Sequence, residues 1–227
     1  MNIQKGKLLF TGILLVLSAI ASNLFVIAQA GLAPLSSLAI QFLLPSVLLI
    51  LLTIIFSKVI QYDDIFHLAI NGIFAGLIAT VSLEIFRESG FRLGTMPGEL
   101  PRLMGVLLLN RFAEGPDIWS DIAGWAYHFW NGASFGIIFS LIFGKSKEWY
   151  GLLCGVLIGI GFMVSPVVKS LGIGLFGHEY KRGFEFATTV TLAHMAYGVV
   201  LAFILKKMNR GRPNIWQRFV MNSQVKI

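Results

Sequence analysis

Six apolar runs dominate the chain and restrict most strongly what it can fold into. They cover residues 8–29, 34–60, 66–86, 122–143, 149–168 and 184–205 of the 227-residue sequence. Each run is about as long as the roughly 20-residue helix that crosses a bilayer. Only 13% of the residues are charged, against roughly 25% in soluble domains. We therefore expect an all-α, polytopic integral membrane protein with about six transmembrane helices and a four-helix core bundle.

Charge and cysteine usage exclude other classes of protein. The single cysteine, Cys154, cannot support a disulfide-stapled secreted module. The net charge of +7 would suit a polyanion, but the basic residues lie at the ends of apolar runs, where membrane topology explains them. Nucleic acid is therefore not an expected partner, and the lipid bilayer is.

Residues 1–62 are predicted to form two N-terminal transmembrane helices. The first follows Lys5 and Lys7 and is longer than the 7–15-residue core of a signal peptide, which favours an uncleaved signal anchor. The sequence 28–30 nevertheless resembles a cleavage site, and a mature chain with five spans is the alternative. Pro45 lies inside the second run and is expected to kink that helix.

Residues 63–207 are predicted to form the four-helix membrane core. A charged, proline-containing connection, 87–121, interrupts it, and the apolar segment at about 99–113 is too short to span, so it is expected to lie in the membrane interface. Residues 208–227 form a basic tail that includes Trp216 and Phe219. This tail is predicted to be cytoplasmic and to bind anionic lipid of the inner leaflet.

Basic residues are distributed unequally between the two sides of the membrane. With the N-terminus inside, eleven Lys and Arg residues fall on the cytoplasmic side and seven on the outer side. The positive-inside rule then places both termini in the cytoplasm.

Glycine patterns predict close helix packing. The chain contains 24 glycines, and GxxxG spacing occurs at Gly72 and Gly76, at Gly132 and Gly136, and at Gly151 and Gly155. Small residues at this spacing let the backbones of membrane helices approach each other.

Two histidines mark a candidate site. His128 and His194 lie in the fourth and sixth runs, and each is followed by a glycine four residues later, on the same helical face. Both runs enter from the outer side, which places the two rings at similar depth. The antiparallel third and fifth runs bring Glu84 and Lys169 toward the same end. The predicted binding site consists of His128, His194, Asn131, Tyr197 and Lys169, and the predicted metal ligands are His128, His194 and Glu84.

The same residues also allow a purely structural interpretation. Glu84 and Lys169 could form an ion pair near the helix ends, and a neutral histidine could join helices by a hydrogen bond. If the histidines do act, three functions compete. The first is binding or transport of a small solute, proton or metal in the outer half of the membrane. The second is a redox subunit of a membrane complex that holds haem or a divalent metal. The third is an intramembrane lipid or quinone enzyme, for which the sequence offers no nucleophile.

Several short segments of the sequence resemble those of a known group of proteins. Residues 79–81, the segment from Met96-Pro97 to Met104-Gly105, and the blocks 125–136 and 193–198 resemble a family of small uncharacterised prokaryotic polytopic membrane proteins. The match extends over about residues 72–207. The resemblance implies a membrane bundle with two intramembrane histidines in a prokaryotic plasma (inner) membrane, and it implies no activity.

Overall fold

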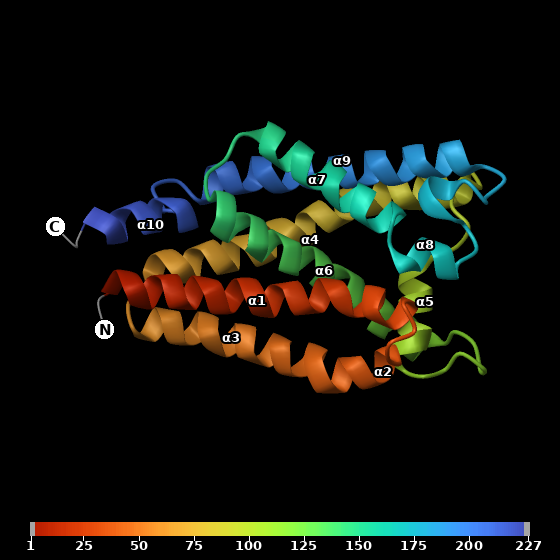
Figure 1. The fold of residues 1–227 in the computed structure, drawn as a ribbon, viewed down its shortest axis with the longest axis horizontal. Coiled ribbons are helices and arrows are strands. Elements are labelled where there is room, and N and C mark those ends of the chain that lie inside the picture. The colour runs from red at the N-terminus through yellow and green to blue at the C-terminus, as the bar shows by residue number, and fades with distance from the viewer. Residues whose placement is uncertain (1–2, 225–227) are drawn as a thin grey trace.

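The computed structural model describes residues 3–224 and is helical, with no strand among those residues. Five segments are long and apolar enough to cross a membrane: α1 (Ile3–Gln29), Leu35–Val59, α4 (Asp63–Arg92), Glu148–Ser170 and α9 (Gly183–Met208). Figure 1 shows the long helices running along the longest axis of the molecule. The expectation of a polytopic helical membrane protein is confirmed.

The sixth expected span, α6 (Ile118–Phe143), differs from the other five. With 26 residues it is long enough to cross a membrane. Its sequence is less apolar, however, and it is not one of the five segments named above. Tyr127, His128 and Asn131 interrupt its apolar sequence and lower its hydropathy. In the fold α6 packs against α4, α1 and the short helix α5 (Leu100–Leu108).

A capping box fixes the start of α6. The backbone N–H of Ser120 donates to the Asp117 carboxylate over 2.8 Å, and the Ser120 hydroxyl accepts from the Asp117 backbone N–H. The bond from Ser120 holds the pKa of Asp117 below its usual range. The cap sets where α6 begins and therefore the depth at which its polar residues lie.

Two prolines break the predicted spans. The helix expected over 34–60 consists of α2 (Leu35–Leu38), a π-helical turn (Ala39–Leu43) and α3 (Leu44–Val59). The π turn ends at Leu43, two residues before Pro45, which has no N–H to donate to the i−4 carbonyl. The helical geometry is thus irregular next to Pro45, and the kink stays a prediction. The run 149–168, predicted as one continuous helix, divides into α7 (Glu148–Met163) and α8 (Pro166–Ser170). Pro166 disfavours helical geometry at the preceding residue, and Ser165 is extended there.

Two glycine contacts hold the core helices together. On α4, a Cβ at Gly72 would lie 2.7 Å from the Gly136 carbonyl oxygen of α6. On α7, a Cβ at Gly151 would lie 2.6 Å from Cβ of Ala202 on α9. All three predicted GxxxG motifs therefore lie at tight helix–helix contacts, α4 with α6 and α7 with α9, as expected.

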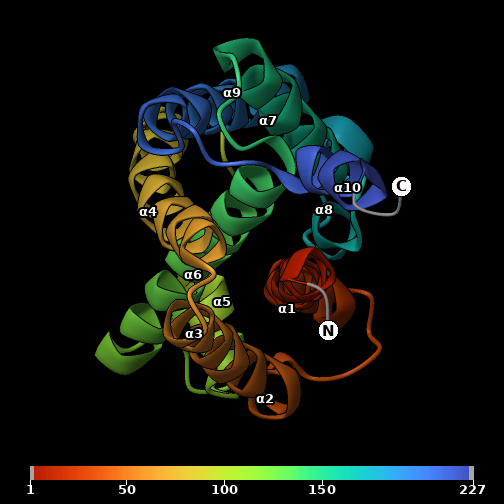
Figure 2. The same ribbon diagram turned by 90° about the vertical axis from the view of Figure 1, so that its left-hand side faces the viewer.

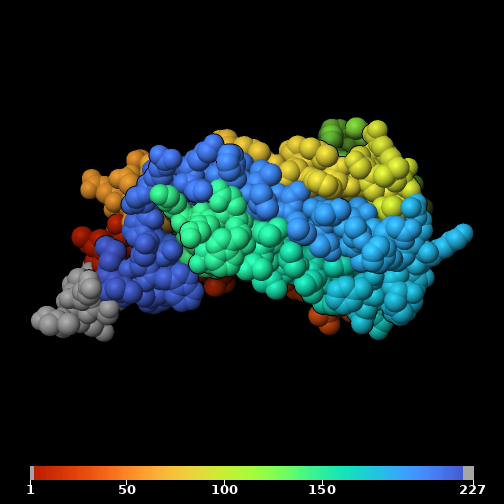
Figure 3. All heavy atoms as spheres, turned by 90° about the horizontal axis from the view of Figure 1, so that it is seen from above, coloured from red at the N-terminus to blue at the C-terminus, as the bar shows by residue number. Residues whose placement is uncertain are grey.

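The four helices predicted as a bundle form an open row. α6 packs on α4, α4 on α9, and α9 on α7, while no comparable packing joins α6 to α7 within the described residues. Figure 2 shows the row as an arc seen from one end. Figure 3 shows α7 and α9 side by side on one face of the molecule, with part of α4 beside α9. The ends of the row do not meet, which leaves space between α6 and α7.

The two N-terminal helices are part of the same packing unit. α1 packs on α6 and α3, and α3 packs on α4. The Tyr127 hydroxyl of α6 donates to the Ala21 carbonyl over 2.8 Å and accepts from the Phe25 backbone N–H at 3.1 Å. The sequence division at residue 62 therefore does not mark a separate structural unit, because α1 contributes directly to the core.

The start of α1 and the helix α10 (Ile215–Gln224) lie at the same end of the molecule (Figure 1). Asp64 joins them: its carboxylate is 2.6 Å from Nη1 of Arg218 and 3.1 Å from Nζ of Lys7. Arg218 is only 1% exposed. The basic tail is thus attached to the helix bundle by a partly buried ion pair.

Enlarging Gly76 should disrupt the contact between α4 and α6. A Cβ there would lie 2.8 Å from Cα of Ala133, so we expect Gly76→Leu to lower the free energy of unfolding by about 1–3 kcal/mol through overpacking. The measurement is unfolding in mixed detergent micelles. Gly12→Leu is the matched control because no atom lies within 4 Å of a Cβ at Gly12. Equal stability of the two variants would contradict the assigned contact.

Candidate functional site

A cavity occupies the space between α6 and α7. It has two lobes of about 240 Å³ and 480 Å³. The two lobes lie side by side, because both are lined by Leu83, Leu100, His128, Phe162 and His194. Most of the lining is apolar or aromatic, as is typical of sites for small organic molecules.

The larger lobe extends to the side of the molecule where α1 faces α7. Asn23 of α1 and Leu157 and Gly161 of α7 line this part of the cavity, and all three are exposed. A Cβ at Gly161 would have no atom within 4 Å. The cavity therefore reaches the surface between α1 and α7, which both belong to the apolar segments that are long enough to cross a membrane.

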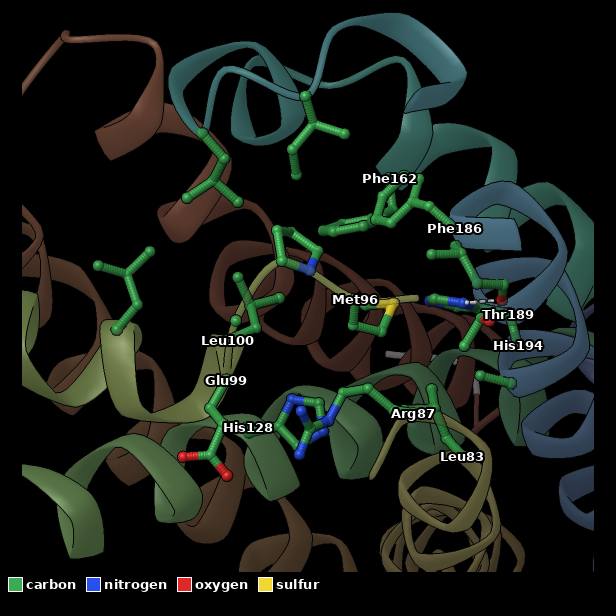
Figure 4. Close-up of a pocket in the computed structure, with 17 residues that line it drawn as sticks. Leu83, Arg87, Met96, Glu99, Leu100, His128, Phe162, Phe186, Thr189 and His194 are labelled. Atoms are coloured by element: carbon green, nitrogen blue, oxygen red, sulfur yellow. Dashed lines mark hydrogen bonds between the residues drawn. The ribbon is translucent and has the colours of Figure 1, made fainter. Parts of the chain in front are cut away.

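The smaller lobe lies under the connection from α4 to α5. Figure 4 shows Glu99 and Leu100 on one side and Phe162 and Phe186 on the other, with Met96 between them. Gly90 makes this geometry possible because a Cβ there would meet side-chain atoms of Thr189 and Thr95. The polar end of the cavity is thus enclosed by the chain that follows α4.

Glu84, Arg87 and His128 form one buried cluster beside the cavity. Nε of Arg87 donates to both carboxylate oxygens of Glu84, over 2.9 and 2.8 Å. Nε2 of His128 lies 2.8 Å from Oε1 of Glu84. Because an ionised carboxylate only accepts, Nε2 of His128 carries the proton of this hydrogen bond. Arg87 and His128 line the cavity, and Glu84 lies behind them.

His194 has a different hydrogen-bond partner. Its Nδ1 lies 2.8 Å from the carbonyl oxygen of Val190, one turn earlier on α9. The ring stacks on Phe162, with centroids 6.2 Å apart. It also packs against α7, since a Cβ at Gly159 would lie 3.3 Å from the His194 side chain. The two histidines predicted to share a site thus line the same cavity.

The other predicted binding residues divide into two groups. Asn131 and Tyr197 line the larger lobe, and the Tyr197 hydroxyl donates to the Gly132 carbonyl over 2.6 Å. Lys169 does not line the cavity: it is exposed on α8. Glu84 forms its ion pair with Arg87, three residues later on the same helix, and not with Lys169, which had been considered as its partner.

The predicted three-ligand metal site is not formed. No group of three or more His, Cys, Asp or Glu side chains gathers as metal ligands in the part of the chain that the structure describes. The reason is that Glu84 hydrogen-bonds His128 and Arg87 instead of lying between the histidines. Glu84 therefore orients the His128 ring by a hydrogen bond and does not lie where it could share a metal ion with both histidines.

Sequence reasoning missed Arg87 as a site residue. The third span was predicted to end at residue 86, but α4 continues to Arg92 over 30 residues, about 45 Å. The spacing of Glu84 and Arg87, three residues apart, could have revealed the pair, because such residues are neighbours on a helix. Asn23, a polar residue within the first apolar run, was also missed.

Comparisons with known proteins give no further information on this site. No protein-family model, no curated protein and no solved structure matches the chain. The resemblance to a family of small prokaryotic membrane proteins stays a prediction.

Removing the Arg87 cation should lower the free energy of unfolding, because Glu84 would stay buried without a partner of opposite charge. We expect Arg87→Met to destabilise the protein by about 3–5 kcal/mol, because a buried carboxylate loses its cation. The double variant Glu84→Gln/Arg87→Met should regain most of this loss. Arg92→Met is the control, since its side chain is 78% exposed and the expected change is within about 0.5 kcal/mol. Unfolding in detergent measures all three, and a double variant no more stable than Arg87→Met would argue against the buried pair.

Proposed function

We propose that this multi-pass membrane protein binds a small amphipathic molecule in the cavity between α6 and α7. The observation that carries the proposal is the lining of that cavity. It combines an apolar and aromatic wall with a smaller number of polar side chains, among them Arg87, His128, Asn131 and His194. Such a combination binds the body of a ligand by apolar contact and orients it by hydrogen bonds.

The position of the opening supports uptake from the membrane. Asn23 and Gly161 lie at the exposed edge between α1 and α7. Both helices also expose large apolar side chains, among them Val16 on α1 and Leu157 on α7, which suits contact with lipid tails. A molecule dissolved in the bilayer could therefore enter sideways without crossing bulk water.

Filling the opening tests this function. Gly161 lines the larger lobe, and a Cβ there would meet no atom within 4 Å. We therefore expect Gly161→Leu to fold normally, to narrow the opening and to lose small molecules that purify with the wild type. The measurement is mass spectrometry of compounds extracted from protein purified in native membrane discs. An at least tenfold loss is expected.

Gly12→Leu, on α1 and away from the cavity, is the matched control, because a Cβ at Gly12 also meets no atom within 4 Å. It should keep the wild-type set of extracted compounds. The proposal fails if Gly161→Leu and Gly12→Leu retain the same compounds in the same amounts.

The orientation in the membrane is also part of the proposal. The end that carries the start of α1 and helix α10 holds Lys7, Lys58, Lys206 and Lys207 among its basic residues. We place this end in the cytoplasm of a prokaryotic cell, at the inner membrane, by the positive-inside rule. A fluorescent protein fused to the C-terminus should then fluoresce. A fusion that is expressed at a normal level but does not fluoresce would indicate the opposite orientation.

Helix α10 is proposed to lie on anionic lipid of the inner leaflet. Trp216, Phe219, Val220 and Met221 are exposed along it, Trp216 by 62%, while Arg218 points inward to Asp64. An exposed apolar face flanked by basic residues is typical of interfacial helices. We expect trypsin to cleave the tail that contains α10 more slowly in anionic vesicles than in neutral vesicles. Equal cleavage rates would contradict the contact between α10 and anionic lipid.

A specific observation favours haem binding as a second candidate function. Both cavity histidines have one ring nitrogen fixed by an acceptor, the Glu84 carboxylate for His128 and the Val190 carbonyl for His194. Histidines that ligate metals usually donate their second N–H in this way. Two such rings could provide the axial ligands of one haem.

An absorbance spectrum and elemental analysis of the purified protein test the haem candidate. A Soret band with bound iron that disappears in His128→Ala, but persists in His178→Ala, is the expected result, since the His178 side chain is 63% exposed and outside the cavity. A colourless protein from cells supplied with haem precursors would reject it.

A further inference from the structure

The polar groups at the two sides of the smaller lobe have opposite hydrogen-bonding roles. On the α9 side, Nδ1 of His194 faces the Val190 carbonyl oxygen, which can only accept. Nδ1 therefore carries the proton, and Nε2 of the neutral ring is an acceptor. Figure 4 shows the His194 ring extending from this bond into the cavity.

On the α4 side, Arg87 offers donors. The residue is 4% exposed and lines the cavity. The Glu84 carboxylate accepts hydrogen bonds from Nε of the Arg87 guanidinium, and Nη2 of the guanidinium lies 2.7 Å from Glu84 Oε2. Nη2 forms no hydrogen bond despite this contact, and Nη1, which is also buried, has no hydrogen-bond partner among the described residues. A buried donor without a partner is costly, so this atom points to a missing acceptor.

The charges around this lobe are balanced. Glu84 neutralises Arg87. Glu99, the carboxylate that lines the lobe, lies 3.5 Å from Nη1 of Arg102. No further Lys or Arg lines either lobe within the described chain. An anionic ligand would therefore bring an uncompensated charge into an apolar site.

From this arrangement we propose that the ligand is a neutral, membrane-soluble molecule with two oxygens, one of which bears a hydroxyl. The hydroxyl donates to Nε2 of His194, and the other oxygen accepts from Nη1 of Arg87. Phe162 and Phe186 pack against the body of the ligand. An aromatic diol of the hydroquinone type and a diacylglycerol share this chemistry. The inference rests on the proposed function, because it names the class of molecule that the cavity binds.

Binding of defined probes to the full chain in nanodiscs tests the inference. The probes are a short-chain alkyl hydroquinone, its dimethyl ether, dioctanoylglycerol and octanoate. The wild type should bind the hydroquinone about tenfold more tightly than the ether, which cannot donate, and octanoate should bind most weakly. One net hydrogen bond corresponds to a change of this order. Comparison of hydroquinone with dioctanoylglycerol then identifies the source of the hydroxyl.

Variants separate the two hydrogen bonds. His194→Phe keeps an aromatic ring beside Phe162 and should reduce the hydroquinone-to-ether preference to about one, while His194→Gln, which retains an acceptor oxygen, should restore part of it. The control His178→Phe alters an exposed ring and should leave the preference unchanged. Arg87→Lys keeps the cation beside Glu84 and should weaken hydroquinone and ether together, whereas Arg92→Lys should not.

Several results would overturn the inference. They are equal binding of hydroquinone and ether to the wild type, a preference that survives in His194→Phe, tightest binding of octanoate, or binding of no probe. Hydroquinone binding that persists in Gly161→Leu would place the probe outside the cavity and would also overturn it. The proposed function is judged separately by the compounds that purify with the protein, so the two can fail independently.

Discussion

The contacts between glycine-bearing backbones are the constraint on which the rest of the structure depends. Gly72 and Gly76 bring α4 against α6, and Gly151 and Gly155 bring α7 against α9. Between apolar helices in lipid, no hydrophobic effect favours association, so close approach and packing must provide the attraction. These contacts fix two of the three helix pairs in the row, α4 packs on α9 as the third pair, and α6 and α7 are left unjoined. The cavity is the consequence of that gap.

Polar groups inside an apolar bundle must stabilise one another, and the Glu84 cluster shows how. A charge buried in a membrane protein is costly, but Glu84 and Arg87 neutralise each other and Glu84 also accepts from His128. The cluster fixes the His128 ring and leaves Nη1 of Arg87 without a partner beside the cavity. The same side chains therefore account for local stability and for a binding surface.

Part of this arrangement was predictable from sequence. The apolar runs predicted the membrane helices, the GxxxG motifs predicted the tight contacts, and the shared spacing of histidine and glycine singled out two residues, His128 and His194, that line one cavity. The cation beside Glu84 was not predicted correctly, because the end of α4 depends on the loop that packs over it. Lys169 was misplaced for a similar reason: Pro166 ends α7 early, and the separate helix α8 buries Val167 and Val168 and leaves Lys169 exposed. Sequence periodicity does not contain such tertiary information.

An experimental density map of the protein in a lipid nanodisc, bound to an antibody fragment to increase its size, tests the central claim most directly. The account predicts that α6 and α7 stay apart, with non-protein density in contact with Arg87 and His194 and continuous with the opening between α1 and α7. A map in which α7 packs directly on α6 and side chains fill the space would contradict it.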